Sequence, residues 1–192
     1  MEMAGNKMLP LLKKRTTNEL ASQNIQFVEA IKSYQNNMFR LSKSILRNDH
    51  DAMDAVGEAI LKAYSKLASL RSFDSFKPWI MKIVVNEAYS IAKKRTKFDY
   101  LSDIETNEAN TTITANSSGV VNPFDSSSSG LWEIVNDLSD EFRVVVVLFY
   151  YEDMSIKDIA KAIGISSGTV KSRLSRARQK LKTAMEFDRR IL

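Results

Sequence analysis

Apolar residues recur three or four positions apart along two separate stretches of the chain, which is the spacing of one buried face of an α-helix. The first stretch runs from Ile25 to about Lys97, and the second runs from Leu131 to about Phe187. The pattern predicts an all-α protein with two small helical domains, each long enough to bury its own core.

Within the first stretch, one or two helices are expected from Ile25 to Ile45, and a strong helix is expected from about Ala52 to Leu70. The apolar face of this strong helix comprises Ala52, Val56, Ala59, Ile60, Ala63, Tyr64 and Leu67. A loop follows, and its Pro78 suits the first turn of a helix from about Trp79 to Lys94. The residues expected to be buried in that helix are Trp79, Ile80, Ile83, Val84 and Ala88.

At the start of the second stretch, local preference and context disagree. Ser139 can cap a helix that begins at Asp140, where acidic residues favour a helix start. The run Val144–Tyr151 has the composition of a strand. Because it follows a helix cap and has no second strand to pair with, we predict a helix.

Residues Ser155–Leu181 have the pattern of two helices joined by a tight turn. Ser155 can cap the first helix, with Asp158 at capping-box spacing. Gly164 suits the left-handed residue that ends a helix, and Ser166 or Ser167 can cap the next one. The apolar face of the first helix comprises Ile156, Ile159, Ala160 and Ile163.

The second of these helices, predicted over Ser167–Lys182, carries the clearest functional pattern. At about 100° per residue, its buried stripe is Val170, Leu174, Ala177 and Leu181. The opposite face, here called the crown, is Ser172, Ser175, Arg176 and Gln179. From Thr169 to Lys182 there are six Lys or Arg residues and no Asp or Glu. Such a helix fits a DNA major groove, with the crown on base edges and the cations near phosphates. A merely solvated amphipathic helix would not explain the lack of acids.

The segment between the two stretches has a different composition. Of the 31 residues in Tyr100–Gly130, 15 are Ser, Thr or Asn, and none is Lys or Arg. Too little apolar surface is present to offset the chain entropy, so residues 99–130 are predicted to be a flexible acidic linker. Residues 1–24 are interpreted as a flexible extension with a short helix around Met8–Leu12, and residues 188–192 as a tail.

Charge and cysteine content narrow the possible functions. The 192 residues carry a net charge of +5, which is compatible with a polyanionic partner. The chain has no cysteine, which excludes disulfides, thiolate catalysis and cysteine-ligated zinc and fits a cytosolic protein. No apolar run reaches the length of a membrane span.

Three segments taken together resemble the extracytoplasmic-function branch of the bacterial sigma-70 family of RNA polymerase sigma factors. They are Asp51–Tyr64, Phe76–Asn86, and Met154–Ala160 followed by Gly168–Arg178. The family has two helical domains, regions 2 and 4, which the resemblance places at residues 25–98 and 131–187. It implies a factor that directs core RNA polymerase to promoters and helps to open the minus-10 element.

The resemblance also assigns residues to three binding surfaces. The acidic patch Asp51, Asp54 and Glu58 would bind core polymerase at the β′ clamp, where complementary charge helps docking. Gly57 stands where the family usually has Gln, which puts one of those contacts in doubt, and Ile60 stands where it often has Phe.

The minus-10 element would be bound by Lys62, Arg71, Phe73, Asp74, Asn86, Ser90, Lys93 and Lys94. Ser90 replaces a residue that is often Asn, and Phe76 and Trp79 are expected in the core rather than against a flipped base. The minus-35 element would be bound by Thr169, Lys171, Ser172, Arg173, Ser175, Arg176, Arg178 and Lys180.

The partners implied by the resemblance are core polymerase, through the β′ clamp and the β flap, promoter DNA, and an anti-sigma factor. It implies no cofactor, metal, small-molecule substrate or catalytic residue. A two-domain helix-turn-helix regulator with a sensing N-terminal domain is the alternative. An enzyme is rejected, because the single histidine, His50, lies in a polar helix-start segment and no phosphate-binding glycine loop is present.

Overall fold

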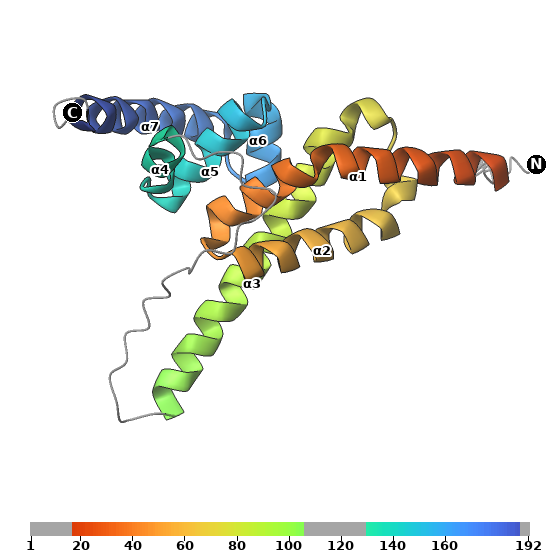
Figure 1. The fold of residues 1–192 in the computed structure, drawn as a ribbon, viewed down its shortest axis with the longest axis horizontal. Coiled ribbons are helices and arrows are strands. Elements are labelled where there is room, and N and C mark those ends of the chain that lie inside the picture. The colour runs from red at the N-terminus through yellow and green to blue at the C-terminus, as the bar shows by residue number, and fades with distance from the viewer. Residues whose placement is uncertain (1–16, 106–129, 189–192) are drawn as a thin grey trace, which may run out of the picture.

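The computed structural model describes residues 17–105 and 130–188, and every regular element within these ranges is helical (Figure 1). The α-helices are α1 (Thr17–Leu46), α2 (Asp49–Ser65), α3 (Phe76–Glu105), α4 (Gly130–Asn136), α5 (Asp140–Val146), α6 (Ile156–Ile163) and α7 (Ser167–Asp188). Two 3-10 turns cover Leu67–Ser69 and Phe73–Ser75, and a π-helical turn covers Val147–Tyr151. The all-α prediction is confirmed.

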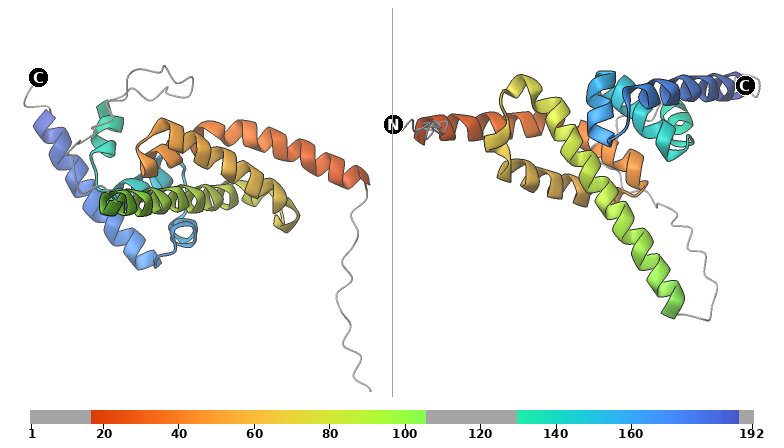
Figure 2. Two further views of the ribbon diagram at one scale, coloured as in Figure 1. Left: turned by 90° about the horizontal axis from the view of Figure 1, so that it is seen from below. Right: turned by 180° about the vertical axis from the view of Figure 1, so that it is seen from behind.

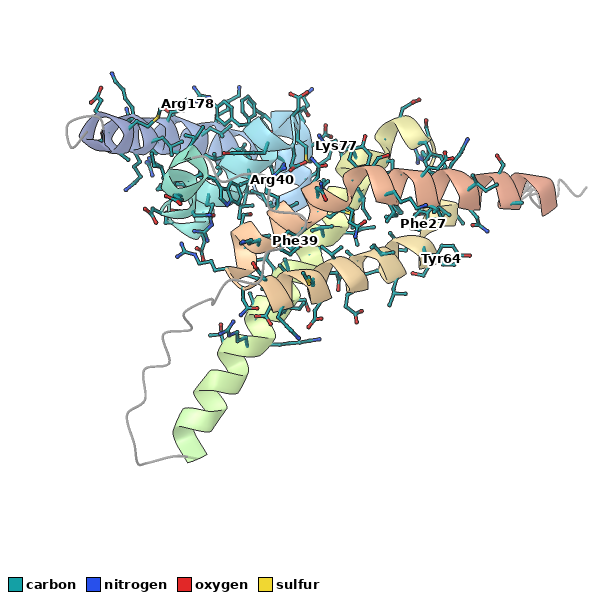
Figure 3. The ribbon with its side chains drawn as sticks, in the orientation of Figure 1. Phe27, Phe39, Arg40, Tyr64, Lys77 and Arg178 are labelled. Atoms are coloured by element: carbon teal, nitrogen blue, oxygen red, sulfur yellow. The ribbon has the colours of Figure 1, made fainter. Side chains whose placement is uncertain are left out.

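Helices α1, α2 and α3 form one group, in which each helix packs on the other two. The predicted face of α2 is buried at Ala52, Val56, Ala59, Ala63 and Leu67. Tyr64, predicted on the same apolar face, is 56% exposed because it lies near the end of α2, although its ring contacts Phe27 (Figure 3). Phe76 is buried as expected, whereas Trp79 is half-buried.

Helices α4 to α7 form the second group, in which α7 packs on α4, α5 and α6. The run from Val144 is helical, as predicted from its context, and its second half forms the π-helical turn. Ser139 occupies the N-cap position of α5, but its side chain makes no capping hydrogen bond. The stripe of α7 is buried at Val170, Leu174 and Ala177, and Leu181 is half-buried.

Two helices extend beyond their predicted ends. The predicted flexible extension is wrong for residues 17–24, because α1 begins at Thr17 and Gln23 Nε2 donates to the Leu67 carbonyl at 3.3 Å. The predicted linker is wrong for residues 99–105, since α3 continues to Glu105 (Figure 2) through a segment with no Gly or Pro to break it. Residues 106–129 and the predicted Met8–Leu12 helix lie outside the described residues.

The two helix groups are in direct contact. Helix α3 packs on α6, and α1 packs on α5 and on the π-helical turn. The buried apolar residues of both groups belong to one continuous cluster. Among the described helices, none is long and apolar enough to cross a membrane.

Candidate nucleic-acid interface

Capping residues determine where α6 begins and ends and where α7 begins, and these two helices form a helix-turn-helix. Ser155 accepts a hydrogen bond from the Asp158 N–H at 3.2 Å, which satisfies a free donor in the first turn of α6. Gly164 ends the helix with φ at +72°, where a residue with a side chain would be strained. Ser166 then accepts from the Thr169 N–H at 3.0 Å and starts α7. All three positions agree with the sequence prediction.

The crown of α7 faces solvent. Ser172, Ser175, Arg176 and Gln179 are exposed, as are Lys171, Arg178 and Lys180. Among the described residues, Lys171, Arg176 and Arg178 take part in no ion pair, so their cationic groups are available to a polyanion. The α7 crown therefore has the chemistry of a major-groove reading surface.

Other predicted minus-35 residues already have partners within the chain. Arg173 forms an ion pair with Glu141 at 3.1 Å, and its side chain is only 27% exposed. Ser172 donates its hydroxyl to the Thr169 carbonyl at 3.0 Å. Lys180 lies over the Phe142 ring at 5.9 Å. To bind DNA, these residues would have to give up their contacts within the chain, whereas Arg176 would not.

The predicted minus-10 residues lie in a loop and on one face of α3, except for Lys62, which lies on α2. In the loop, Arg71 and Asp74 are exposed, and the half-buried Phe73 ring stacks on Phe76 at 5.8 Å with 14° between the planes. The loop thus places the half-buried Phe73 ring near the exposed side chains of Arg71 and Asp74. An aromatic ring together with polar side chains is the combination with which proteins hold a flipped base.

On α3, the predicted residues Asn86, Ser90, Lys93 and Lys94 are all exposed. Lys82 is also exposed, four residues before Asn86 and therefore on the same face, and it was missed by sequence reasoning. Lys62 of α2 forms an ion pair with Glu87 of α3, which competes with any contact to phosphate.

The predicted acidic patch, apart from Asp51, lies along one wall of a groove of about 810 Å³ between α2 and α3. Asp54 and Glu58 line it, with the exposed apolar residues Met53 and Leu61 beside them. A Cβ on Gly57 would meet no atom within 4 Å, so packing within the chain does not require the glycine. The opposite wall holds Ser90 and Lys94, so these two predicted minus-10 residues share a groove with the acidic patch.

Comparison with known proteins identifies the family. Residues 30–98 match the family described as Sigma-70 region 2, and residues 129–181 match Sigma-70, region 4. The RNA polymerase sigma factor SigV of Bacillus subtilis (strain 168) is 30% identical over 165 residues, which cover 86% of this chain and 90% of that protein. The ECF RNA polymerase sigma factor SigW of the same organism is 28% identical over 179 residues, covering 90% and 95%.

A solved structure agrees with these matches. The sigma factor RpoE of Bartonella quintana, in complex with the anti-sigma factor NepR, superposes with a TM-score of 0.65 and 26% identity over 84% of this chain and 98% of that chain. The chain belongs to the extracytoplasmic-function branch of the sigma-70 family. The match to region 2 removes the alternative of a regulator with a sensing N-terminal domain.

Sequence reasoning missed the polar residues at which the two helix groups meet. Glu152 follows the π-helical turn and is fully buried. Its carboxylate accepts from Asn37 Nδ2 at 2.7 Å and from Arg40 Nη1 at 3.2 Å, and Lys77 Nζ lies 3.8 Å away. Burial raises the pKa of Glu152, and these three groups offset the effect only in part.

Proposed function

We propose that this chain is a promoter-recognition subunit whose region 4, residues 131–187, binds the minus-35 element through α7. The observation that carries the proposal is the exposed, acid-free crown of α7, beside which Lys171 and Arg178 form no ion pair within the described part of the chain. Arg176 is the candidate for a bidentate contact to guanine, and Lys171, Ser172 and Ser175 are the neighbouring readers. Thr169, Arg173, Arg178 and Lys180 would position the helix on phosphates.

Region 2, residues 25–98, would bind the minus-10 element. The proposal is supported by the exposed Arg71 and Asp74 beside the Phe73 ring. A base that leaves the stack during strand opening would lie on this ring and be read by the polar pair. Asn86, Lys93 and the additional residue Lys82 would follow the strand along α3, with Lys62, Ser90 and Lys94 at the edge of this surface.

Core polymerase would dock on the groove between α2 and α3. Asp54 and Glu58 supply charge at its rim, and Met53 and Leu61 supply apolar surface. Exposed apolar residues next to these carboxylates suit docking on a basic partner surface, such as the β′ clamp. Region 4 would make the second polymerase contact, with the β flap.

Control by an anti-sigma factor is part of the same proposal. It is supported by the superposition on a relative that was solved with its anti-sigma factor. A subunit of this kind acts in the cytoplasm, performs no catalysis of its own and needs no cofactor.

The experiment is binding of the purified chain to purified core polymerase, followed by selection of bound DNA from a random library. The proposal expects a stable complex that enriches two sequence elements at a fixed spacing. A chain that enriches a single element without polymerase would instead be an ordinary helix-turn-helix regulator.

A further inference from the structure

The cations on the two flanks of α7 differ in their contacts. Lys171 and Arg178, on one flank, are exposed and form no ion pair within the described part of the chain. Arg173 and Lys180 are seven residues apart and therefore lie on one side of the helix, which is the other flank. Both of them contact residues of α5, which packs against α7 (Figure 1). This second flank is here called the α5-facing flank.

Glu141, in the first turn of α5, binds the first cation of the α5-facing flank. Its Oε2 lies 3.1 Å from Nη2 of Arg173. The side chain of Arg173 is only 27% exposed, whereas that of Glu141 is 51% exposed. Water and salt therefore screen this ion pair less than a fully exposed one. The pair holds the guanidinium against α5.

The next residue of α5 contacts the second cation. Lys180 Nζ lies 5.9 Å from the centre of the buried Phe142 ring, which is a cation–π contact. Lys180 itself is exposed, and an aromatic ring carries no net charge. A phosphate could therefore approach this ammonium without displacing an anion. On the α5-facing flank, Glu141 is the residue that neutralises a cation.

A carboxylate and a phosphate compete for the same arginine. Both present anionic oxygens that fit the planar fork of a guanidinium. Within the chain, Glu141 occupies the place on Arg173 that a phosphate of bound DNA would take. A contact between Arg173 and DNA therefore requires the ion pair to break, and it leaves the freed carboxylate near the phosphate backbone. This cost is the same for every DNA sequence.

The gain that offsets this cost does depend on sequence. On an arbitrary sequence, the crown finds few matching base edges, and the helix is held by phosphate contacts alone. Lys171 and Arg178 can make such contacts without breaking an ion pair. On the matching minus-35 sequence, base contacts hold α7 in the groove and keep one phosphate next to Arg173. The exchange of Glu141 for phosphate is then favourable.

We propose that Glu141 is a specificity-determining residue of region 4 that acts through Arg173. It keeps this arginine away from the phosphates of non-matching DNA, and Arg173 moves to phosphate only when the crown is seated on the matching sequence. Glu141 is thus a positioning residue that takes the place of a phosphate inside the protein. The difference between matching and arbitrary DNA rests on the proposed function, whereas the competition between Glu141 and phosphate does not.

The test measures how the affinity of the full chain for a mixed-sequence DNA duplex depends on salt. The variants are Glu141→Gln, Arg173→Ala and the two combined. Glu133→Gln is the matched control, since it makes the same chemical change at an exposed residue of α4 that forms no ion pair within the described residues. Circular dichroism and thermal melting verify that every variant is folded.

Each phosphate contact adds about 0.9 to the slope of log K against log salt. Glu141→Gln should bind the mixed-sequence duplex more tightly and steepen this slope by about 0.9, because Arg173 becomes available. Arg173→Ala should leave the slope of the unmodified chain unchanged and should abolish the gain in the combined variant. The same loss for Arg173→Ala in both backgrounds, or a gain in Glu141→Gln no larger than in Glu133→Gln, would overturn the proposal.

A second measurement uses a duplex that carries the minus-35 element selected with core polymerase. Arg173→Ala should weaken binding of the unmodified chain to this duplex. Glu141→Gln should lower the ratio of its affinity to that for the mixed-sequence duplex severalfold, and an unchanged ratio would overturn the role in specificity. Failure to select any element would contradict the proposed function instead, and the salt slopes, which use no promoter, distinguish the two failures.

Discussion

The Asp51 carboxylate of α2 binds the Arg95 guanidinium of α3 at 2.9 Å, so this predicted polymerase-docking acid is paired with an arginine inside the chain. Asp54 lies 3.4 Å from the exposed His50 ring rather than beside an arginine, and Asp54 and Glu58 both line the open groove. We therefore expect Asp54→Ala combined with Glu58→Ala to weaken core binding at least tenfold, and Asp51→Ala to weaken it much less. Titration of labelled protein with core polymerase measures both.

Binding to an isolated minus-35 duplex is the control for these variants, and it should not change. If Asp51→Ala proves to be the most damaging of the three substitutions, the Asp51–Arg95 pair does not persist in the complex and the assignment of the groove is wrong.

Substitutions of Arg176 and of Arg178 should change DNA binding in different ways. Arg176 belongs to the crown, so Arg176→Ala should lose about 1–3 kcal/mol of discrimination at one or two base pairs of the minus-35 element. Arg178 lies on the flank, so Arg178→Ala should weaken all sequences alike and lower the salt dependence by about one phosphate contact. Binding to a panel of single-base variants at several salt concentrations separates the two. Equal losses on every sequence for Arg176→Ala would make it a phosphate contact.

Gly57 lines the groove between α2 and α3, so a substitution at this position tests whether core polymerase binds there. A methyl group at this position meets no atom within 4 Å, and alanine favours a helix by about 1 kcal/mol over glycine. We expect Gly57→Ala to raise the melting temperature by about 3 °C, the shift that 1 kcal/mol gives in a chain of this size. If a polymerase side chain or backbone approaches the groove at Gly57, core affinity should fall in the same variant. Thermal melting and core titration on one preparation measure both effects.

The arrangement in which the two helix groups pack on each other, here called the closed state, should depend on pH through Glu152. Burial raises its pKa in the closed state, and Asn37 and Arg40 on α1 and Lys77 on α3 lower it only in part. When the groups separate, the pKa returns towards the ordinary value of 4.5. The closed state therefore binds more protons within this window, and it should gain population as pH falls from the raised pKa towards 4.5. The distance between spin labels on the two helix groups, attached through Ala68→Cys and Ala184→Cys at exposed positions, reports the change when it is measured as pH falls towards 4.5.

Glu152→Gln is the control for this titration, because it keeps the size and hydrogen-bonding capacity of the side chain without the charge. It should stay closed and lose the pH dependence. His50, the only histidine in the chain, is exposed and pairs with Asp54 rather than with the second helix group. A pH response that survives in Glu152→Gln would assign the effect to another group.

The parts of the structure that local chemistry determines could be predicted from the sequence. Ser155, Gly164 and Ser166 act on backbone groups within a few residues, so the helix-turn-helix and the crown of α7 followed from spacing alone. The run from Val144 needed context, because its strand preference was overridden by the cap before it and by burial on several sides.

The contacts between the two helix groups could not be predicted in this way. Asn37 and Arg40 occupy a polar helix face that looks like any solvated surface, and their partner Glu152 lies more than 100 residues along the chain. The outer end of α3 was also missed. The change in composition near Tyr100 suggested a linker, but nothing in the next few residues prevents the helix from continuing to Glu105.

Transcription in vitro tests the central claim most directly. Purified core polymerase is combined with the chain and with a template that carries a selected promoter, and the transcript ends are mapped. The account predicts initiation at one position, dependent on the chain, reduced by changes in either promoter element, and lost when Asp54→Ala is combined with Glu58→Ala. Transcripts that do not depend on the chain, or a chain that binds the promoter but never comigrates with core polymerase, would contradict it.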